Sequence, residues 1–304
     1  MSRAVVFDEY GGPEVLRILE SDPPEPGPGQ VMVRVQAAGV QPFDCLFRSG
    51  AAHAWAPAEF PQRLGNEFAG TIDAVGDGVA GFSVGDEVLG WAMLSSHADH
   101  VVAGQHEIVA KPQGMPWPDA GVLSASGQTA ATALRLLGVT ADDTVLIHAA
   151  AGGVGSFAVQ IAHASGARVI GTASERNHPY LRELGATPVM YGDGLVGRVP
   201  ELAGGKVTAS LDASGTVEAL HASLELVADK SRIATVAYQP VANDLGIRRL
   251  STERSAEQLA ELTGLYASDR LRVSIQHAYP LEQTAEAHRA VETGHVRGKV
   301  VLKP

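Results

Sequence analysis

The sequence predicts an α/β protein in which a doubly wound parallel sheet follows a smaller, barrel-like β domain. Short β-branched segments with frequent glycines precede residue 110, and apolar strands alternate with helical segments from residue 120. The composition, with 45% apolar residues and 34 glycines, suits helices packed closely on a sheet. At 304 residues the chain is long for one hydrophobic core, so we expect two domains.

Residues before position 110 predict short strands joined by turns. The proline-rich segment Asp22–Gln30 cannot be helical, and it separates two of these strands. A composition shift places the domain boundary near Met115–Asp119. The strands expected in this barrel-like unit are Ala4–Phe7, Val31–Ala37, Phe68–Val75 and Glu87–Trp91.

From residue 120 the pattern becomes that of alternating helices and buried strands. We expect a helix over Ala120–Leu137, ended by Gly138. The alternation predicts a parallel sheet with right-handed crossovers. Its expected strands are Thr144–Ala149, Ala167–Thr172, Pro188–Tyr191, Ala209–Asp212 and Arg232–Tyr238, with helices through about Ser165 and at Tyr180–Leu184 and Val217–Val227.

The C-terminal segment predicts two helices and two strands. They are the helices Ser255–Tyr266 and Leu281–Glu292 and the strands Arg272–Ile275 and Lys299–Leu302. We expect the last strand to return to the first domain. That domain would then be discontinuous, comprising residues 1–119 and 269–304 around a second domain of residues 120–268.

Charge and composition argue against several classes of partner. A net charge of −11 without a Lys/Arg cluster is unsuited to nucleic acid. No segment approaches the ~20 apolar residues that span a bilayer, and the N-terminus lacks a signal-peptide pattern, so we expect a cytoplasmic protein without a membrane partner. The single cysteine, Cys45, excludes an internal disulfide and a cysteine-rich zinc lobe.

A glycine-rich turn follows the first strand of the expected parallel sheet. One glycine permits a sharp turn, another lets the backbone approach a pyrophosphate, and the last lets helix and strand pack closely. The phosphate then meets the N–H groups and the positive dipole end of the following helix. Alternatively, such a turn joins strand and helix without a ligand. Because strand, turn and helix follow in this order, we expect a dinucleotide to bind at Ala151, Gly152, Gly153, Val154 and Gly155.

The segment after the next strand bears on which dinucleotide binds. NAD enzymes place an acidic residue about 20 positions after the turn, where it binds the ribose 2′-OH. Here Ser174, Arg176 and Tyr191 are suited to a 2′-phosphate, which favours NADPH. Alternatively, Glu175 recognises NAD and Arg176 is a solvated charge.

Three motifs together resemble the medium-chain dehydrogenase/reductase superfamily, in particular its zinc-free quinone oxidoreductase branch. They are GNEFAGTIDAVGDGVAGFSVGDEV (Gly65–Val88), HAAAGGVGSFAVQIA (His148–Ala162) and GHVRGKVVL (Gly294–Leu302). The match runs from Arg3 to Pro304. The resemblance implies a GroES-like β-barrel catalytic domain, a Rossmann domain that binds NADP, an active site in the cleft between them, and a homodimer.

Two substitutions bear on zinc. Zinc-dependent members have a cysteine ligand where this chain has Gln41 and a histidine ligand where it has Asn66, and amides are poor zinc ligands. His97 and His100 lack a third ligand, so we expect them to be loop residues and expect no metal. Without a Lewis acid, alcohol oxidation is disfavoured and a small quinone or α,β-unsaturated carbonyl substrate is favoured, because amide donors suffice for its oxygen.

The resemblance also implies roles for individual residues. The Gln41 amide faces the nicotinamide or the substrate oxygen, and Asp44 holds the loop. His53 is the local proton donor where the family has tyrosines; alternatively it is a surface residue and solvent supplies the proton. The positions implied near the cofactor are Thr129, Ser214, Val236, Ala237, Tyr238, Arg297 and Lys299. For Arg297 and Lys299, the resemblance places one of the two near the cofactor; alternatively, each is a solvated charge.

Two other functions stay open at this level. One is a dedicated ene-reductase of a biosynthetic pathway, for which Trp55 and the absent tyrosines would shape a specialised pocket. The other is a non-catalytic protein that binds NADPH as a sensor or binds a partner protein, because no essential acid or nucleophile stands out in the sequence.

Overall fold

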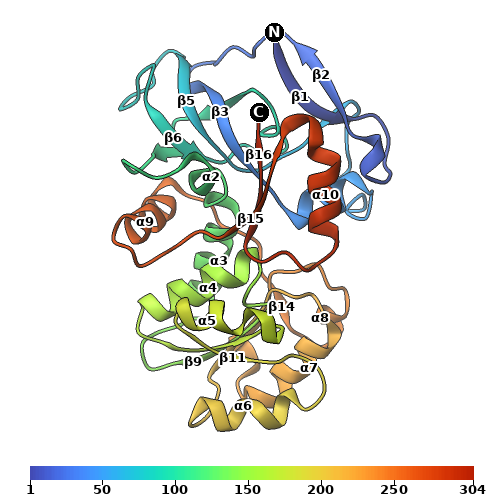
Figure 1. The fold of residues 1–304 in the computed structure, drawn as a ribbon, viewed down its shortest axis with the longest axis vertical. Coiled ribbons are helices and arrows are strands. Elements are labelled where there is room, and N and C mark those ends of the chain that lie inside the picture. Colours follow the sequence, from blue (N-terminus) through green and yellow to red (C-terminus); the bar gives the residue numbers. More distant parts are fainter. The chain divides into compact units, whose positions relative to one another are not determined.

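The computed structural model describes residues 1–304, which divide into two compact units. Unit 1 comprises Met1–Ala125, Ser255–Gly264 and Val273–Pro304, and unit 2 comprises Ser126–Arg254 and Leu265–Arg272. Figure 1 shows the helices and strands of both units in chain order. None of the helices combines the length and the apolar character needed to cross a membrane.

Unit 1 is built on two sheets. A three-stranded antiparallel sheet has the order β2 (Arg17–Ser21), β1 (Ser2–Phe7), β4 (Gln62–Arg63). In β3 (Gln30–Val40), valines at alternate positions are buried in the core of the larger sheet, as the β-branched alternation predicts. The path of that seven-stranded sheet is β15 (Ile275–Pro280), β16 (Lys299–Lys303), β3, β5 (Phe68–Val75), β6 (Glu87–Gly90) and β8 (Ile108–Ala110), and β7 (His100–Gly104) also pairs with β3.

The C-terminal strand β16 joins residues from opposite ends of the chain. It pairs antiparallel with β3, with Val300 opposite Val40 and Leu302 opposite Ala38. Helix α10 (Thr284–Glu292) lies against β15 and β16 (Figure 1). It also contacts helix α1 (Pro42–Arg48). Residues near position 40 and near position 299 are therefore neighbours in space.

Unit 2 is a six-stranded parallel sheet. Its order is β11 (Ala186–Val189), β10 (Arg168–Thr172), β9 (Thr144–His148), β12 (Ala209–Asp212), β13 (Ile233–Thr235) and β14 (Arg248–Arg249). This is the doubly wound order, and the chain reverses its direction of winding between β9 and β12. Together with the β-rich first unit, this sheet confirms the predicted α/β fold class. The helices between its strands are α4 (Gly153–Ala164), α5 (His178–Glu183), α6 (Leu195–Ala203), α7 (Val217–Leu226) and α8 (Val241–Asp244).

Several expected elements differ from the structure. The single helix expected at Ala120–Leu137 is wrong: α2 (Trp117–Ala120) and α3 (Ser124–Leu136) are separated by a turn. The turn lies where a Cβ on Gly121 would come within 2.6 Å of the Ala37 carbonyl oxygen, so the chain approaches β3 too closely for most side chains. Helix α6 was not expected, and neither were α1, β2, β7 and β8. Helix α9 (Ala256–Ala267) lies one residue beyond its expected range, and the strand expected at Arg272–Ile275 begins only at Ile275.

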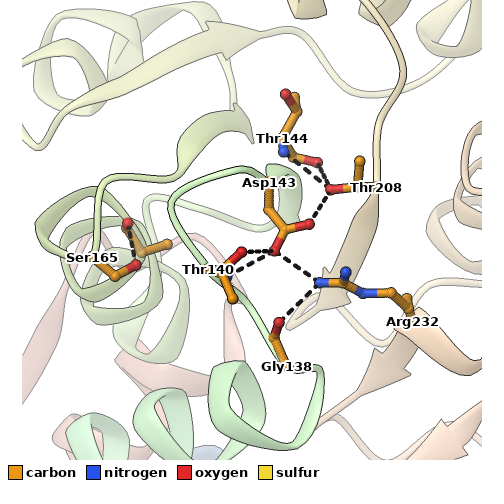
Figure 2. A network of polar contacts seen from close by, with 8 residues as sticks. Gly138, Thr140, Asp143, Thr144, Ser165, Thr208 and Arg232 are labelled. Carbon is orange, nitrogen blue, oxygen red and sulfur yellow. Dashed lines mark hydrogen bonds and ion pairs between the residues drawn. The ribbon is translucent and has the colours of Figure 1, made fainter.

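A polar network closes the N-terminal edge of the unit 2 sheet (Figure 2). Asp143, which precedes β9, accepts hydrogen bonds from Thr208 Oγ1 at 2.7 Å, Thr140 N at 2.7 Å and Arg232 Nη2 at 3.0 Å. Burial alone would raise the pKa of Asp143, but the hydrogen bonds from Thr208, Arg232 and Thr140 outweigh it and hold the pKa at about 2. Ligands of such sheets bind at the opposite, C-terminal edge, so this network is structural.

Candidate functional site

The glycine-rich turn lies at the C-terminal end of β9, the strand beside which the winding reverses. Ala149 begins the turn with φ of 51°, a left-handed conformation that few residues other than glycine adopt. Gly152 is the N-cap of α4, and its N–H donates to the Ala149 carbonyl at 2.9 Å. The turn thus leads directly into a 12-residue helix, and the N–H groups of the first helical turn lie at the glycine-rich turn.

Gly155 explains why the last glycine of the turn is needed. A Cβ at this position would lie 2.2 Å from the Ala149 carbonyl oxygen and 2.7 Å from the Ala150 Cα. Only glycine lets α4 pack this closely on the end of β9. Gly152, Gly153 and Val154 are half-exposed, whereas Ala151 and Gly155 are buried, so the turn offers its backbone at the surface of unit 2.

The residues expected to choose between NADPH and NADH follow two neighbouring strands. Thr172, the last residue of β10, lies opposite Val189, the last of β11, and the Ala173 N–H donates to the Val189 carbonyl at 3.0 Å. Ser174 and Arg176 therefore leave the sheet beside Tyr191. Arg176 and Tyr191 are exposed and Ser174 is half-buried, and Ser174 Oγ accepts from Asn177 Nδ2 at 3.3 Å.

One buried carboxylate shapes the segments that follow β12 and β13. Asp212, which is fully buried, accepts from Ser214 N at 2.8 Å and from Ser214 Oγ at 2.6 Å. It also accepts from Gly215 N at 3.2 Å and from Thr235 Oγ1 at 2.7 Å. A single side chain thus positions Ser214 and the start of the segment that holds Val236, Ala237 and Tyr238.

His148 ends β9 directly before the turn. Burial lowers the pKa of His148, although the nearby Asp212 carboxylate opposes that shift, so the ring is neutral at pH 7. Ser223 Oγ donates to the Ala219 carbonyl at 2.8 Å, so it accepts from His148 Nε2, which lies 3.1 Å away. The imidazole is therefore a structural hydrogen-bond donor in the core of unit 2.

Thr129 lies on α3, and its Oγ1 is 2.6 Å from Thr252 Oγ1. The other cofactor positions expected in unit 2 follow the C-terminal ends of its strands, and the glycine-rich turn among them continues into the first turn of α4. The roles of all these residues in binding a cofactor stay predictions.

A second polar cluster lies inside unit 1, around Gln41. Gln41 is the N-cap of α1 and is 8% exposed, and its Nε2 donates to Glu67 Oε1. Its Oε1 accepts from Lys299 Nζ at 2.8 Å. Lys299 Nζ also lies 3.1 Å from Glu67 Oε1, and the two side chains are 3% and 0% exposed. An amide, a carboxylate and an ammonium therefore form one buried cluster.

Glu67 and Asp44 tie this cluster to the surrounding backbone. Glu67 Oε2 accepts the Ala125 N–H at 2.6 Å, in the first turn of α3. Gln41 N donates to the Asp44 carboxylate at 2.7 Å and the Gln41 side chain accepts from the Asp44 N–H, which forms a capping box at the start of α1. Asn66 Nδ2 also donates to Asp44, at 2.7 Å. Burial raises the pKa of Asp44, while the nearby His97 and Lys299 oppose the shift.

The cluster is poorly suited to a zinc ion. At the two positions that the resemblance assigns to zinc ligands, this chain has the amides Gln41 and Asn66, and both are bonded to carboxylates. The Lys299 ammonium already pairs with Glu67, the carboxylate that the side-chain amide of Gln41 contacts. A divalent cation beside that ammonium would meet like charge and would displace existing hydrogen bonds. No group of three or more His, Cys, Asp or Glu side chains is arranged to hold a metal ion.

His53 is exposed and pairs with Tyr10. The Ala58 N–H donates to Tyr10 Oη at 2.7 Å, and Tyr10 Oη lies 3.0 Å from His53 Nδ1. When the ring is neutral and Tyr10 donates to Nδ1, the hydrogen of His53 is on Nε2. Trp55 is 44% exposed, and its ring lies 5.8 Å from that of Phe43.

The two C-terminal cations occupy different environments. Arg297 is exposed, and its backbone N–H donates to Gln276 Oε1 at 2.5 Å. Lys299 is buried against Gln41 and Glu67, so it is not a solvated charge.

Sequence reasoning assigned no role to the side chains of Glu67, Asp212 or Tyr10. The sequence contains a signal for the two acids, because each is the single charged residue of a segment, NEFAG or ASLDA, and a charge is rarely buried without partners. No local signal pairs Tyr10 with His53, because their contact depends on the fold.

This chain is similar to known proteins along its whole length. The model of the alcohol dehydrogenase GroES-like domain matches residues 27–135, and the model described as zinc-binding dehydrogenase matches residues 184–302. A quinone oxidoreductase of Pseudomonas aeruginosa is 32% identical over 328 residues, covering 100% of both chains.

Two solved structures add information on cofactors. The Escherichia coli quinone oxidoreductase complexed with NADPH has a TM-score of 0.86 at 29% identity, covering 100% of both chains. A structure described as an NAD-dependent alcohol dehydrogenase has a TM-score of 0.89 at 32% identity, covering 99% of both chains. The similar proteins thus include an NADPH complex and a protein named for NAD.

Proposed function

Since this chain belongs to the quinone oxidoreductase branch of the medium-chain dehydrogenase/reductase superfamily, we propose that it is an NADPH-dependent oxidoreductase that reduces a small quinone or α,β-unsaturated carbonyl compound without zinc. The observation that carries the proposal is the glycine-rich turn at the point where the winding reverses, with Gly155 packed too closely for any side chain. Sheets of this order bind dinucleotides at that point.

Unit 2 has the features that a dinucleotide requires. The pyrophosphate would bind the N–H groups at the start of α4, beside Gly152 and Gly153. The 2′-phosphate would bind Ser174 and Arg176, with Tyr191 beside them, because a guanidinium matches phosphate geometry. Ser214 and Val236–Tyr238, positioned by Asp212, would line the nicotinamide.

NADPH, when bound, supplies the hydride. With an enone, the β-carbon gains that hydride, negative charge develops on the acceptor oxygen as an enolate, and the α-carbon takes a proton to give the saturated carbonyl compound. With a quinone, the net gain of the hydride and one proton gives the hydroquinone, and negative charge again develops on an acceptor oxygen. We assign the Gln41 amide to that oxygen as the hydrogen-bond donor, because a fixed donor in a buried site stabilises developing charge. His53, held by Tyr10, is the proposed local proton donor.

The absence of a metal role is proposed from the donor set. Gln41 and Asn66 are amides bonded to carboxylates, and Lys299 supplies a positive charge next to Gln41. An acceptor whose reduction places charge on a conjugated oxygen needs less activation than an alcohol or an isolated ketone. The homodimer and the cytoplasmic location stay predictions; β14, the edge strand in question, comprises only the exposed Arg248–Arg249.

One set of assays tests the proposal. The protein is mixed with NADPH or NADH and with 1,4-benzoquinone, 9,10-phenanthrenequinone or a short enone, and oxidation is followed at the nicotinamide absorbance band. We expect oxidation of NADPH in preference to NADH with at least one acceptor. Replacing Gln41 with Ala should lower kcat by about 10²- to 10³-fold, the typical cost of an oxyanion donor.

Gln113 provides the matched control, because it is an exposed glutamine of unit 1. Gln113→Ala should leave kcat unchanged. If NADPH binds while every acceptor fails, the reductase proposal is wrong and a non-catalytic nucleotide-binding protein is favoured. If the enone alone reacts, the dedicated ene-reductase is favoured over the quinone reductase.

A further inference from the structure

We propose that Lys299 is a positioning residue that orients the Gln41 amide and polarises it toward the acceptor oxygen. This inference rests on the proposed function, because it concerns the donor assigned there. Lys299 was expected near the cofactor or in solvent, but its ammonium is buried within unit 1. The carbonyl oxygen of Gln41 accepts a hydrogen bond from this ammonium. The carboxylate of Glu67 forms an ion pair with it.

The chemistry of the partners selects one orientation of the Gln41 amide. An ammonium only donates hydrogen bonds, so the amide atom 2.8 Å from Lys299 Nζ must be the oxygen. A carboxylate only accepts, so the amide atom facing Glu67 must be the nitrogen. Lys299 and Glu67 therefore favour the same orientation of the amide. The opposite orientation would place the amide nitrogen against the ammonium and the amide oxygen against the carboxylate.

The positive charge also changes the strength of the donor. A cation on the amide oxygen withdraws electron density from the nitrogen, which makes the N–H bonds stronger donors, and low polarity enhances this effect. Lys299 and Glu67 are 3% and 0% exposed, so water screens the interaction little. One N–H of Gln41 Nε2 donates to Glu67, and we assign the other to the acceptor oxygen.

The backbone fixes Lys299 in this place. Gly298 has φ of 69°, and a Cβ there would lie 2.1 Å from the Ser274 carbonyl oxygen, so the turn before β16 requires glycine. The Lys299 N–H donates to the same carbonyl at 2.9 Å. Lys299 is therefore the first residue of β16 and lies inside unit 1, whereas Lys303 at the other end of the strand is exposed.

Activity in a double-mutant cycle tests whether Lys299 acts through Gln41. Lys299→Met should lower kcat about 10- to 100-fold, less than loss of the whole donor, with little change in the KM for NADPH. In a Gln41→Ala background the same change should cost less than about 2-fold, because residues that act through one another are not additive. Lys299→Arg should recover part of the activity, and Lys303→Met should leave it unchanged.

A charge-balanced variant separates this role from simple pairing with Glu67. Lys299→Met alone leaves Glu67 as an unpaired buried carboxylate, which destabilises the fold. Lys299→Met combined with Glu67→Gln removes both charges and restores melting temperature. If kcat in that variant stays below the kcat of Glu67→Gln alone, the positioning role is supported. If kcat returns to the wild-type value, or if the cycle is additive, Lys299 only balances Glu67 and the inference is wrong.

A spectroscopic measurement tests the inference independently of activity. The side-chain ¹⁵N–¹H signals of Gln41 are assigned by their loss in Gln41→Ala. They should move in Lys299→Met and stay in place in Lys303→Met. Unmoved Gln41 signals in Lys299→Met would overturn the inference even in an active enzyme, whereas a wild-type protein that reduces no acceptor would overturn the proposed function instead.

Discussion

Replacing Asp143 with Asn removes the charge at the centre of the network in Figure 2. In the folded protein its hydrogen bonds lower the pKa of Asp143 from an ordinary 3.8 to about 2. Because this pKa is depressed, the unfolded chain binds more protons between these two values. The stabilisation is therefore complete above about pH 4 and is lost as the pH falls toward 2.

The magnitude follows from the two pKa values. Each pKa unit corresponds to ~1.4 kcal/mol, so the charge contributes about 2 kcal/mol at pH 7 and about half of that at pH 3. At about 2–4 °C per kcal/mol, Asp143→Asn should lower the melting temperature by about 4–8 °C at pH 7. The difference from wild type should shrink by about half at pH 3.

Thermal melts between pH 3 and pH 7 measure this effect. Asp142→Asn is the matched control, because Asp142 is the neighbouring aspartate but is exposed, and its melting temperature should follow wild type. The kcat of Asp143→Asn below its melting temperature should also follow wild type, since the network lies at the edge of the sheet opposite the turn. A loss of stability that is equal at pH 3 and pH 7 would refute the electrostatic explanation.

Three further predictions concern the two units. Gly155→Val should abolish NADPH binding in a fluorescence titration, because the valine side chain would collide with the Ala149 carbonyl. The control Gly197→Ala should bind NADPH normally, because nothing lies near a Cβ at that position. Tight binding by Gly155→Val would contradict the packing argument. Arg176→Ala should raise the KM for NADPH about 10-fold or more and leave the KM for NADH unchanged, and an unchanged KM for NADPH would remove Arg176 from the site. Burial raises the pKa of the Cys45 thiol, so a thiol reagent should label no cysteine in the folded protein and one after unfolding; rapid labelling of the native protein would contradict its burial.

The sequence supports the fold because its signals are local. Strands β9 to β13 of unit 2 are short, mainly apolar segments, and β5 of unit 1 and β12 of unit 2 begin and end where the sequence predicts. The glycine-rich turn is also local, because its function depends on consecutive residues. The break between α2 and α3 is not local: Gly121 packs on Ala37, and Glu67 binds the first turn of α3.

The cluster around Gln41 could not be predicted for the same reason. The sequence identifies Gln41 as a replacement for a metal ligand, yet its partner Lys299 lies 258 positions away. Only the pairing of β16 with β3 brings them together. A cation near the C-terminus is equally compatible with solvent, a cofactor phosphate or a buried carboxylate until the strand pairing is known.

Metal dependence provides the most direct test of the central claim, an oxidoreductase that transfers hydride from NADPH without zinc. The protein is dialysed against a strong chelator, its metal content is measured by mass spectrometry, and oxidation of NADPH by 1,4-benzoquinone is followed. We predict an unchanged kcat in protein that contains no zinc. Activity that disappears with the metal and returns when zinc is added would contradict the account.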